Sequence, residues 1–238
     1  MNSFFRFKQF SIHQEKCAMK VCTDACVFGA WVAEDIRDRQ VERILDIGAG
    51  TGLLTLMLAQ KTTAAIDAIE IDQAASEQAA GNIAASNWAD RIKLMNISLQ
   101  EFKSIYHYDC IICNPPFYEK DLRSDDESIN AARHDTTLKL EELMLFISLY
   151  LSNSGKAYVL IPWHRTGYAM ETAVKQGLFV QKKMLMKQSV KHGYFRTVLV
   201  LSKNTKATHE TEEISIRDFE QEYTDRFVEL LKDYYLRL

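Results

Sequence analysis

The tetrapeptide Asn114-Pro115-Pro116-Phe117 combines residue types that can hold and activate a planar amine. Such an amine is a poor nucleophile because its lone pair is conjugated with the ring that carries it. The Asn114 side-chain oxygen and the Pro115 carbonyl could accept its two hydrogens, which would favour a pyramidal nitrogen with an available lone pair. The prolines fix φ and lack an N–H, so their carbonyls remain accessible. Phe117 could stack on the ring, a contact worth about 1–3 kcal/mol that tolerates any base.

A glycine-rich segment, Leu45-Asp46-Ile47-Gly48-Ala49-Gly50-Thr51-Gly52, precedes this tetrapeptide and falls between an apolar run and a helical pattern. Its GxGxG spacing differs from the GxGxxG that places a pyrophosphate on a helix N-terminus. Asp46, two residues before the first glycine, suits a cationic ligand better than a phosphate. S-adenosylmethionine carries a sulfonium and an ammonium and no phosphate. We therefore predict that this loop binds S-adenosylmethionine, from which methyl transfer needs only positioning and electrostatics.

Two acidic residues follow the glycine loop by about twenty positions, in Ala68-Ile69-Glu70-Ile71-Asp72. A carboxylate at this distance, at the end of the next strand, can accept hydrogen bonds from both ribose hydroxyls of a nucleotide-like ligand. We assign this role to Glu70, and expect Asp72 to cap the following helix.

The elements that must position these residues alternate between apolar runs and helical patterns, which indicates a parallel sheet covered by helices. The predicted strands are Arg43–Ile47, Ala64–Glu70, Ile92–Asn96, Tyr108–Cys113, Lys156–Ile161, Val180–Lys187 and Thr197–Ser202. The predicted helices are Leu53–Gln60, Gln73–Asn87, Leu138–Leu151 and Thr166–Gln176. The fold class is therefore α/β, a doubly wound Rossmann-like sheet. No helix separates the last two strands, so they should form a terminal antiparallel hairpin.

The rest of the chain adds two features. Ile214–Leu238 has apolar residues at helical spacing and should pack back on the domain. Tyr118–Thr137 is a polar insertion between a strand and a helix, where long loops tend to be functional.

Composition bounds the class of protein. The 238 residues, 47% hydrophobic and 26% charged, fit one globular domain. The apolar runs are too short for a membrane span and no signal peptide is recognisable, so we expect a cytoplasmic protein without a membrane partner. Five irregularly spaced cysteines indicate reduced thiols. Cys110 and Cys113 should face opposite sides of a strand, so we predict no metal.

The net charge of −3 means that any nucleic-acid site must be a local basic surface. Arg133 and His134 follow the Asn-Pro-Pro-Phe motif, and Lys187, Lys191 and Arg196 gather around the predicted hairpin. Clusters of charged residues usually do no more than face the solvent. We nevertheless take these five residues as candidate RNA contacts.

Together these residues resemble one family of class I methyltransferases, the bacterial tRNA(Val) (adenine-37-N6)-methyltransferases. The resemblance covers essentially the whole chain and extends to the helix expected at Tyr223–Leu238. Its most discriminating parts are Phe7-Lys8-Gln9-Phe10, Cys17-Ala18-Met19-Lys20-Val21-x-Thr23-Asp24, Gly29-Ala30-Trp31 and Ala132-Arg133-His134-Asp135.

The resemblance implies a seven-stranded class I fold that acts on a tRNA, and a monomer is expected. Residues 1–40 would form an amino-terminal segment covering the cofactor, and residues 41–238 the methyltransferase domain with its carboxy-terminal helix. Ser98 stands where related enzymes often carry an acid, which should weaken that cofactor contact. The implied cofactor-binding set is Lys20, Thr23, Asp24, Asp46, Gly48, Ala49, Gly50, Gly52, Glu70, Ser98 and Asn114.

Other functions remain compatible with the motifs. Protein glutamine N5-methyltransferases share Asn-Pro-Pro, and so do DNA adenine and rRNA guanine methyltransferases. A non-catalytic RNA-binding module is a different class, against which the intact Asn114 argues.

Overall fold

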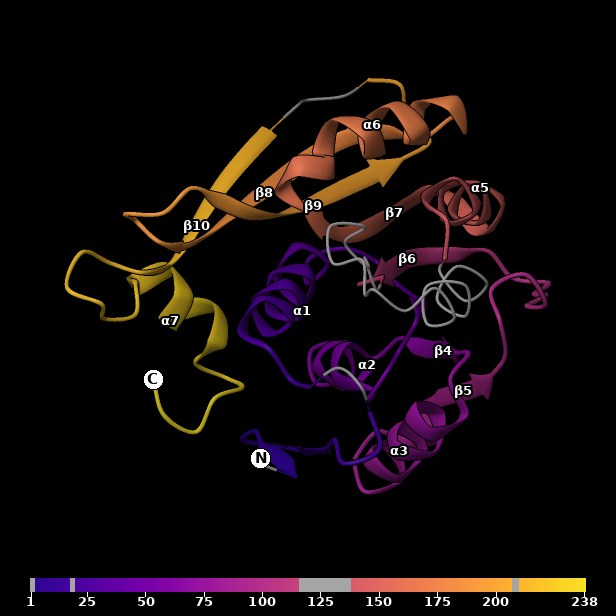
Figure 1. Cartoon of the computed structure of the whole chain (residues 1–238). Coiled ribbons are helices and arrows are strands. Elements are labelled where there is room, and N and C mark those ends of the chain that lie inside the picture. The colour runs from indigo at the N-terminus through magenta and orange to yellow at the C-terminus, as the bar shows by residue number, and fades with distance from the viewer. Residues whose placement is uncertain (1–2, 18–19, 116–137, 207–209) are drawn as a thin grey trace, which may run out of the picture.

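The computed structural model describes residues 3–17, 20–115, 138–206 and 210–238. Within these residues one central sheet has eight strands (Figure 1). Their order across the sheet is β10 (Glu210–Arg217), β8 (Phe179–Ser189), β9 (Tyr194–Ser202), β7 (Leu151–Pro162), β6 (Tyr108–Cys113), β3 (Arg43–Ile47), β4 (Ala65–Glu70) and β5 (Ile92–Asn96).

The strand directions confirm the predicted α/β class. From β5 to β7 all neighbours are parallel, whereas β9 runs antiparallel to both β7 and β8. The predicted terminal hairpin is therefore present, and it is inserted so that β9 lies between β7 and β8. Cys110 and Cys113 contribute to the cores on opposite faces of the sheet, as expected from their spacing.

Two layers of helices cover the sheet (Figure 1). The core on one face includes residues of α1 (Thr23–Asp35), α2 (Leu53–Ala59), α3 (Gln73–Ala84) and α7 (Asp225–Leu231). The core on the other face is closed by α5 (Leu140–Tyr150) and α6 (Thr166–Lys175). Two short 3-10 helices are η1 (Ala89–Arg91) and η2 (Trp163–Arg165), and β1 (Phe4–Arg6) pairs with β2 (Ser11–His13) in a small separate sheet.

Helix α1 was not predicted from the sequence. Its residues from Ala25 to Ala33 are all buried, so it lacks the polar face that gives a helix its periodic signal. Trp31 and Phe28 lie in the same core as α2 and the sheet. The boundary at residue 40 stays a prediction, and α1 shares its core with the residues that follow it.

The carboxy-terminal prediction was wrong in its first half. Strand β10 occupies Glu210–Arg217, where Ile214 and Ile216 are buried with the two-residue period of a strand. Phe219, expected on the packed face, is 67% exposed. Helix α7 begins only after Thr224, whose side chain caps it, and buries Phe227 and Leu231 as expected.

None of the helices among the described residues combines the length and the apolar character that crossing a bilayer requires.

Candidate active site

The candidate residues meet at the carboxyl edge of the parallel strands. Ile47 of β3 is paired with Cys113 of β6 on one side and with Ile69 of β4 on the other. The residues that follow these pairs, Gly48 and Asn114, therefore lie on neighbouring strand ends, beside Glu70. The structure thus brings together the glycine loop, Glu70 and the start of the Asn-Pro-Pro-Phe motif, which are far apart in the sequence.

The glycine loop uses the backbone freedom of glycine. Gly48, Gly50 and Gly52 have φ values of 72°, 56° and 81°, a region that other residues rarely adopt. The N–H groups of Gly48 and Ala49 donate to the Ile69 carbonyl at 2.9 and 3.0 Å, which ties the loop to β4. Among the described residues, a Cβ built on Gly48 or Gly50 would meet no atom within 4 Å. The described part of the chain therefore leaves room for a ligand to come close to the backbone of Gly48 and Gly50.

Glu70 supports this loop directly. One carboxylate oxygen accepts from the Gly50 N–H at 2.7 Å and the other from the Asp72 N–H at 2.9 Å. Each carboxylate oxygen can accept a second hydrogen bond, so the ribose role remains available to Glu70. Asp72 caps α3 by accepting from the Ala75 N–H at 2.7 Å, which confirms the capping role expected for it.

Asp46 is the buried acid beneath the loop. It is fully buried, and one of its oxygens accepts from the Thr55 hydroxyl at 2.5 Å. Its other oxygen, Oδ1, has no hydrogen-bond partner within the part of the chain that the structure describes. Burial raises the pKa of Asp46 to about 7; the Thr55 hydrogen bond opposes this shift, and the nearby charge of Glu70 adds to it. A partnerless carboxylate oxygen beneath an open loop fits a positively charged ligand such as S-adenosylmethionine.

Thr55 was missed by the sequence reasoning. It fixes the orientation of Asp46 from the first turns of α2, where every residue is buried. The sequence does contain a signal for it, a single hydroxyl in the apolar run Leu53-Leu54-Thr55-Leu56. A buried polar side chain needs a hydrogen-bond partner, so this hydroxyl indicates a contact with another polar group.

Protonation of Asp46 should oppose binding of a cationic cofactor. Because the pKa is raised to about 7, the carboxylate is protonated below that value and must lose its proton to receive the cation. We expect cofactor affinity to fall as the pH drops from 7 to 5.5, by up to about tenfold per unit. Calorimetric titration at several pH values would measure it, within a range where the ligand's own amino group stays charged. Asp46→Asn is the control, and it should bind the cofactor weakly with an affinity that does not depend on pH. If the affinity of the wild-type protein is equally independent of pH, protonation of Asp46 is not coupled to cofactor binding.

Ser98 lies at the same edge, two residues beyond Asn96, the residue paired with Glu70. Its hydroxyl donates to a Glu101 carboxylate oxygen at 2.6 Å, and the Glu101 N–H donates back to the hydroxyl at 3.2 Å. This is the reciprocal S-x-x-E pattern that caps a helical turn. The hydroxyl is therefore held locally, with acceptor capacity left for a cofactor contact, which stays a prediction.

The amino-terminal segment is anchored beside the loop. The Asn82 side chain of α3 donates to the carbonyls of both His13 and Thr51, each at 2.9 Å. The pKa of Cys17 is raised mainly by burial and further by the charge of Glu70, so this thiol lies close to the site. Lys20 donates to the Gln14 carbonyl. These contacts place residues 11–20, apart from 18 and 19, along the border of the cofactor loop.

Asp24 and Arg196 were predicted for different roles, one with the cofactor and the other with RNA. The structure joins them in an ion pair of 2.9 Å between the start of α1 and β9. Thr23, the first residue of α1, is exposed beside this pair.

The Asn-Pro-Pro-Phe motif is only partly described. Asn114 is half-buried and Pro115 is buried, directly after β6. Pro116, Phe117, Arg133 and His134 lie outside the described residues, as does the whole of the Tyr118–Thr137 insertion.

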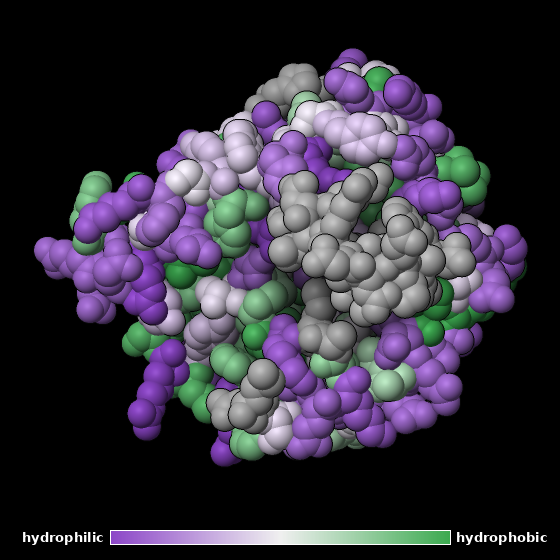
Figure 2. Space-filling view, in the orientation of Figure 1, coloured by the Kyte–Doolittle hydropathy of each residue, from purple (hydrophilic) through white to green (hydrophobic). Residues whose placement is uncertain are grey.

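The hairpin cations are close together but already have partners. Lys187 pairs with Glu213 at 3.2 Å, and the Lys191 ammonium donates to the Phe219 carbonyl at 2.7 Å. Figure 2 shows mainly hydrophilic side chains over the hairpin and the segment leading to α7. Surface pairs of this kind contribute little, about 0–1 kcal/mol, so an RNA phosphate could compete for the cations.

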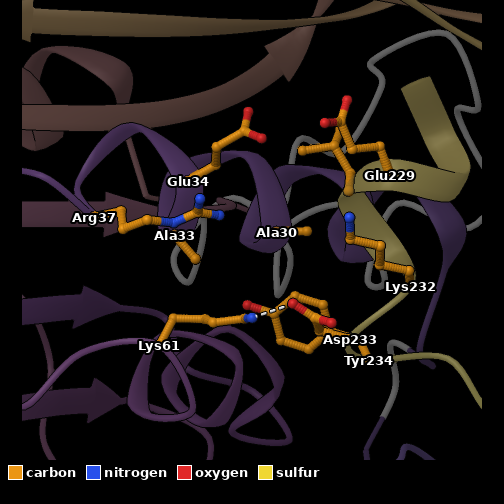
Figure 3. A pocket seen from close by; sticks show the side chains of 10 residues that line it. Ala30, Ala33, Glu34, Arg37, Lys61, Glu229, Lys232, Asp233 and Tyr234 are labelled. Atoms are coloured by element: carbon orange, nitrogen blue, oxygen red, sulfur yellow. Dashed lines mark hydrogen bonds and ion pairs between the residues drawn. The ribbon is translucent and has the colours of Figure 1, made fainter.

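Hollows outside the glycine loop are also lined by described residues. A groove of about 560 Å³ separates the start of α1 from the hairpin and is lined by Asp24, His192, Arg196, Arg217 and Tyr223, among others. A smaller hollow lies between α1 and α7, where Lys61 pairs with Asp233 (Figure 3). The latter is at the amino edge of the strands, away from the candidate site.

The fold and the glycine loop, with Asp46 beneath it and Glu70 and Asn114 beside it, define a class I S-adenosylmethionine-dependent methyltransferase. Residues 24–136 match the model of the family described as "Methyltransferase small domain". Among solved structures, a predicted O-methyltransferase from Agrobacterium tumefaciens superposes with a TM-score of 0.67 at 15% identity, covering 88% of this chain and 95% of that one. A methyltransferase from Pyrococcus furiosus has a TM-score of 0.54 at 22% identity, covering 75% and 83%. These similarities show the fold.

Relatives at higher identity define the family. The tRNA1(Val) (adenine(37)-N6)-methyltransferase of Cytophaga hutchinsonii is 41% identical over 240 residues, covering 100% of this chain and 99% of the relative. The protein with the same description from Dyadobacter fermentans is 42% identical over 240 residues, covering 99% and 98%. The chain belongs to the tRNA1(Val) (adenine(37)-N6)-methyltransferase family.

Proposed function

We propose that the protein transfers a methyl group from S-adenosylmethionine to N6 of adenine 37 in tRNA1(Val). The observation that carries the proposal is the 41% identity over the whole chain with a protein of that description. The positions of Glu70, Gly48 and Asn114 at the ends of adjacent strands support the proposal. They bring a loop that can bind the cofactor next to a motif that can hold an amine.

This proposal gives a separate role to each group of residues at the carboxyl edge of the sheet. Gly48 to Gly52 would let the cofactor approach the backbone, Glu70 would accept its ribose hydroxyls, and Asp46 would balance its positive charge. When bound, S-adenosylmethionine supplies an electrophilic methyl group on a sulfonium. The Asn114 oxygen and the Pro115 carbonyl would accept the two N6 hydrogens and direct the nitrogen lone pair, while Phe117 would stack on the adenine.

The segment around Lys20, Thr23 and Asp24 would cover the bound cofactor. Its support is the anchoring of residues 11–17 to α3 and the proximity of Cys17 to Glu70. We further propose that the enzyme acts as a monomer in the cytoplasm, where tRNA is present.

The function is tested by mass spectrometry of nucleosides from purified tRNA1(Val), before and after incubation with the protein and S-adenosylmethionine. N6-methyladenosine should appear, and replacement of adenine 37 by guanine should abolish it. A methylated protein glutamine, or a methylated DNA or rRNA with unmodified tRNA, would favour the corresponding alternative. Absence of saturable S-adenosylmethionine binding would favour a non-catalytic RNA-binding module.

RNA would be held by Lys187, Lys191 and Arg196 of the hairpin, together with Arg133 and His134. The three hairpin cations stand at the same carboxyl edge as Asn114, since β8 ends and β9 begins there. Each phosphate contact releases counterions, so the logarithm of affinity should fall with the logarithm of salt concentration by about 0.7 per contact on single strands.

Replacement of Lys187, Lys191 and Arg196 together by Ala should weaken tRNA binding and reduce that slope by about 2 if each contacts one phosphate. S-adenosylmethionine affinity should be unchanged in the Lys187/Lys191 double variant, which keeps the Arg196–Asp24 ion pair beside the cofactor-covering segment. The charge-matched control replaces Lys103, Lys175 and Lys206, which are exposed at the opposite, amino edge. Filter binding over a range of salt concentrations would give both slopes. The parental slope in the hairpin variant would show that RNA binds elsewhere.

A further inference from the structure

Trp163 is an exposed aromatic residue next to the site. It is the first residue of η2, directly after the carboxyl end of β7, and is 40% exposed. The other two tryptophans differ, since Trp31 is 1% exposed and Trp88 is half-buried against the core. Single exposed apolar residues are common, so exposure alone assigns no role to Trp163.

The support beneath Trp163 is what distinguishes it. Its ring packs on Tyr194 of β9, with centroids 4.9 Å apart and an interplanar angle of 51°. The Lys187 ammonium of β8 lies 4.5 Å from the centroid of the same tyrosine ring. Side chains from three neighbouring parts of the sheet are therefore in contact, and we call this group the Trp163 platform: Trp163, Tyr194 and Lys187.

One carboxylate fixes the lower part of this platform. The Tyr194 hydroxyl donates to Glu213 of β10, and Lys187 pairs with the other oxygen of Glu213 at 3.2 Å. Tyr194 is thus restrained through both its ring and its hydroxyl, while Trp163 keeps part of its surface open to solvent. An aromatic ring already held in place loses little conformational freedom when a second ring stacks on it.

The Trp163 platform lies close to Asn114, where the target base would be held. Cys113 of β6 is paired with Val159 of β7, so Asn114 lies beside Leu160, three residues before Trp163. With strands about 4.8 Å apart and about 3.3 Å per residue, the Cα atoms of Asn114 and Trp163 are separated by about 11 Å. A nucleotide adjacent to an adenine held at Asn114 can span that separation in an unstacked strand.

We propose that Trp163 stacks on an unpaired base next to the methylated adenine in the RNA strand, with Tyr194 and Lys187 as its support. This assignment rests on the proposed function for the identity of the target base. Unpaired bases bind proteins by stacking on aromatic rings, and cations beside those rings attract the backbone. His164 is exposed next to Trp163, and Arg165 follows it, so the surroundings of the ring favour a polyanion over an apolar protein surface.

Replacement of Trp163 by Ala should weaken tRNA binding about tenfold, within the roughly 5- to 150-fold range that loss of one stacked base corresponds to. KM for tRNA should rise more than kcat falls, and S-adenosylmethionine affinity should be unchanged. Trp163→Phe should restore most of the tRNA affinity, because phenylalanine also stacks. The matched control is Tyr106→Ala: Tyr106 is 44% exposed with the Arg43 guanidinium 3.6 Å from its ring centroid, at the opposite edge of the sheet.

A fluorescence titration tests the contact independently of catalysis. A single-stranded RNA with the anticodon-loop sequence should quench tryptophan emission of the wild-type protein, and the quenching should disappear in Trp163→Phe. Unchanged tRNA affinity in Trp163→Ala, or quenching that persists in Trp163→Phe, would overturn the assignment even if the protein methylates adenine 37. Quenching that depends on Trp163 without any tRNA methylation would instead support the platform and refute the proposed function.

Discussion

Replacement of Asn114 by Ala should reduce kcat by about 10²–10³-fold, the range for loss of one hydrogen bond that stabilises a transition state. The side-chain oxygen would act on the amine as its nitrogen becomes pyramidal, so its contribution is larger in the transition state than in the ground state. S-adenosylmethionine affinity should therefore change by less than about threefold. Single-turnover methylation of tRNA1(Val) and calorimetric titration of the cofactor measure the two quantities.

The control for this variant is Asn153→Ala, which removes an exposed asparagine near the amino edge of the same sheet. It should leave turnover unchanged. If Asn114→Ala loses cofactor affinity as much as it loses rate, Asn114 belongs to cofactor binding, and the amine must be held by other groups.

Replacement of Glu70 by Ala should weaken S-adenosylmethionine binding by about 1.5–3 kcal/mol, the range for hydrogen bonds to a charged group. Glu70 also holds the loop in place, because its carboxylate accepts from the N–H groups of Gly50 and Asp72. Ala would leave both N–H groups without this acceptor. Glu70→Gln keeps one acceptor oxygen and should lose less affinity than Glu70→Ala.

Calorimetry on both variants and thermal unfolding without ligand would separate these tasks. A large fall in Tm with unchanged cofactor affinity would limit Glu70 to organising the loop. An unchanged Tm and unchanged affinity would remove it from the site altogether.

Much of the fold was predictable because strand and helix signals alternate regularly between Arg43 and Ser202. The glycine loop, Glu70 and Asn114 were identified by type and spacing, and parallel strand ends necessarily bring them to one edge. Helix α1 was not predicted because its buried residues lie on all of its sides. Strand β10 was not predicted because its two-residue period is directly followed by residues with helical spacing.

Contacts between side chains were less predictable. The Asp24–Arg196 pair and the support of Tyr194 by Glu213 join residues far apart in sequence, and neither partner carries a local signal for the other. The raised pKa of Asp46 likewise depends mainly on its complete burial, which the sequence does not show.

The two ends of the described chain meet against α2, the helix that follows the glycine loop. The Lys8 N–H donates to the Tyr234 carbonyl at 2.8 Å, Phe7 pairs with Tyr235, and the Tyr234 hydroxyl donates to the Met57 carbonyl of α2 at 3.1 Å. During synthesis, Phe7 and Lys8 therefore cannot make their contacts with Tyr234 and Tyr235 until residue 235 has left the ribosome, whereas His13 can already bind Asn82. Contacts of such long sequence separation close slowly, so the nascent enzyme exposes part of its core until translation has passed that point.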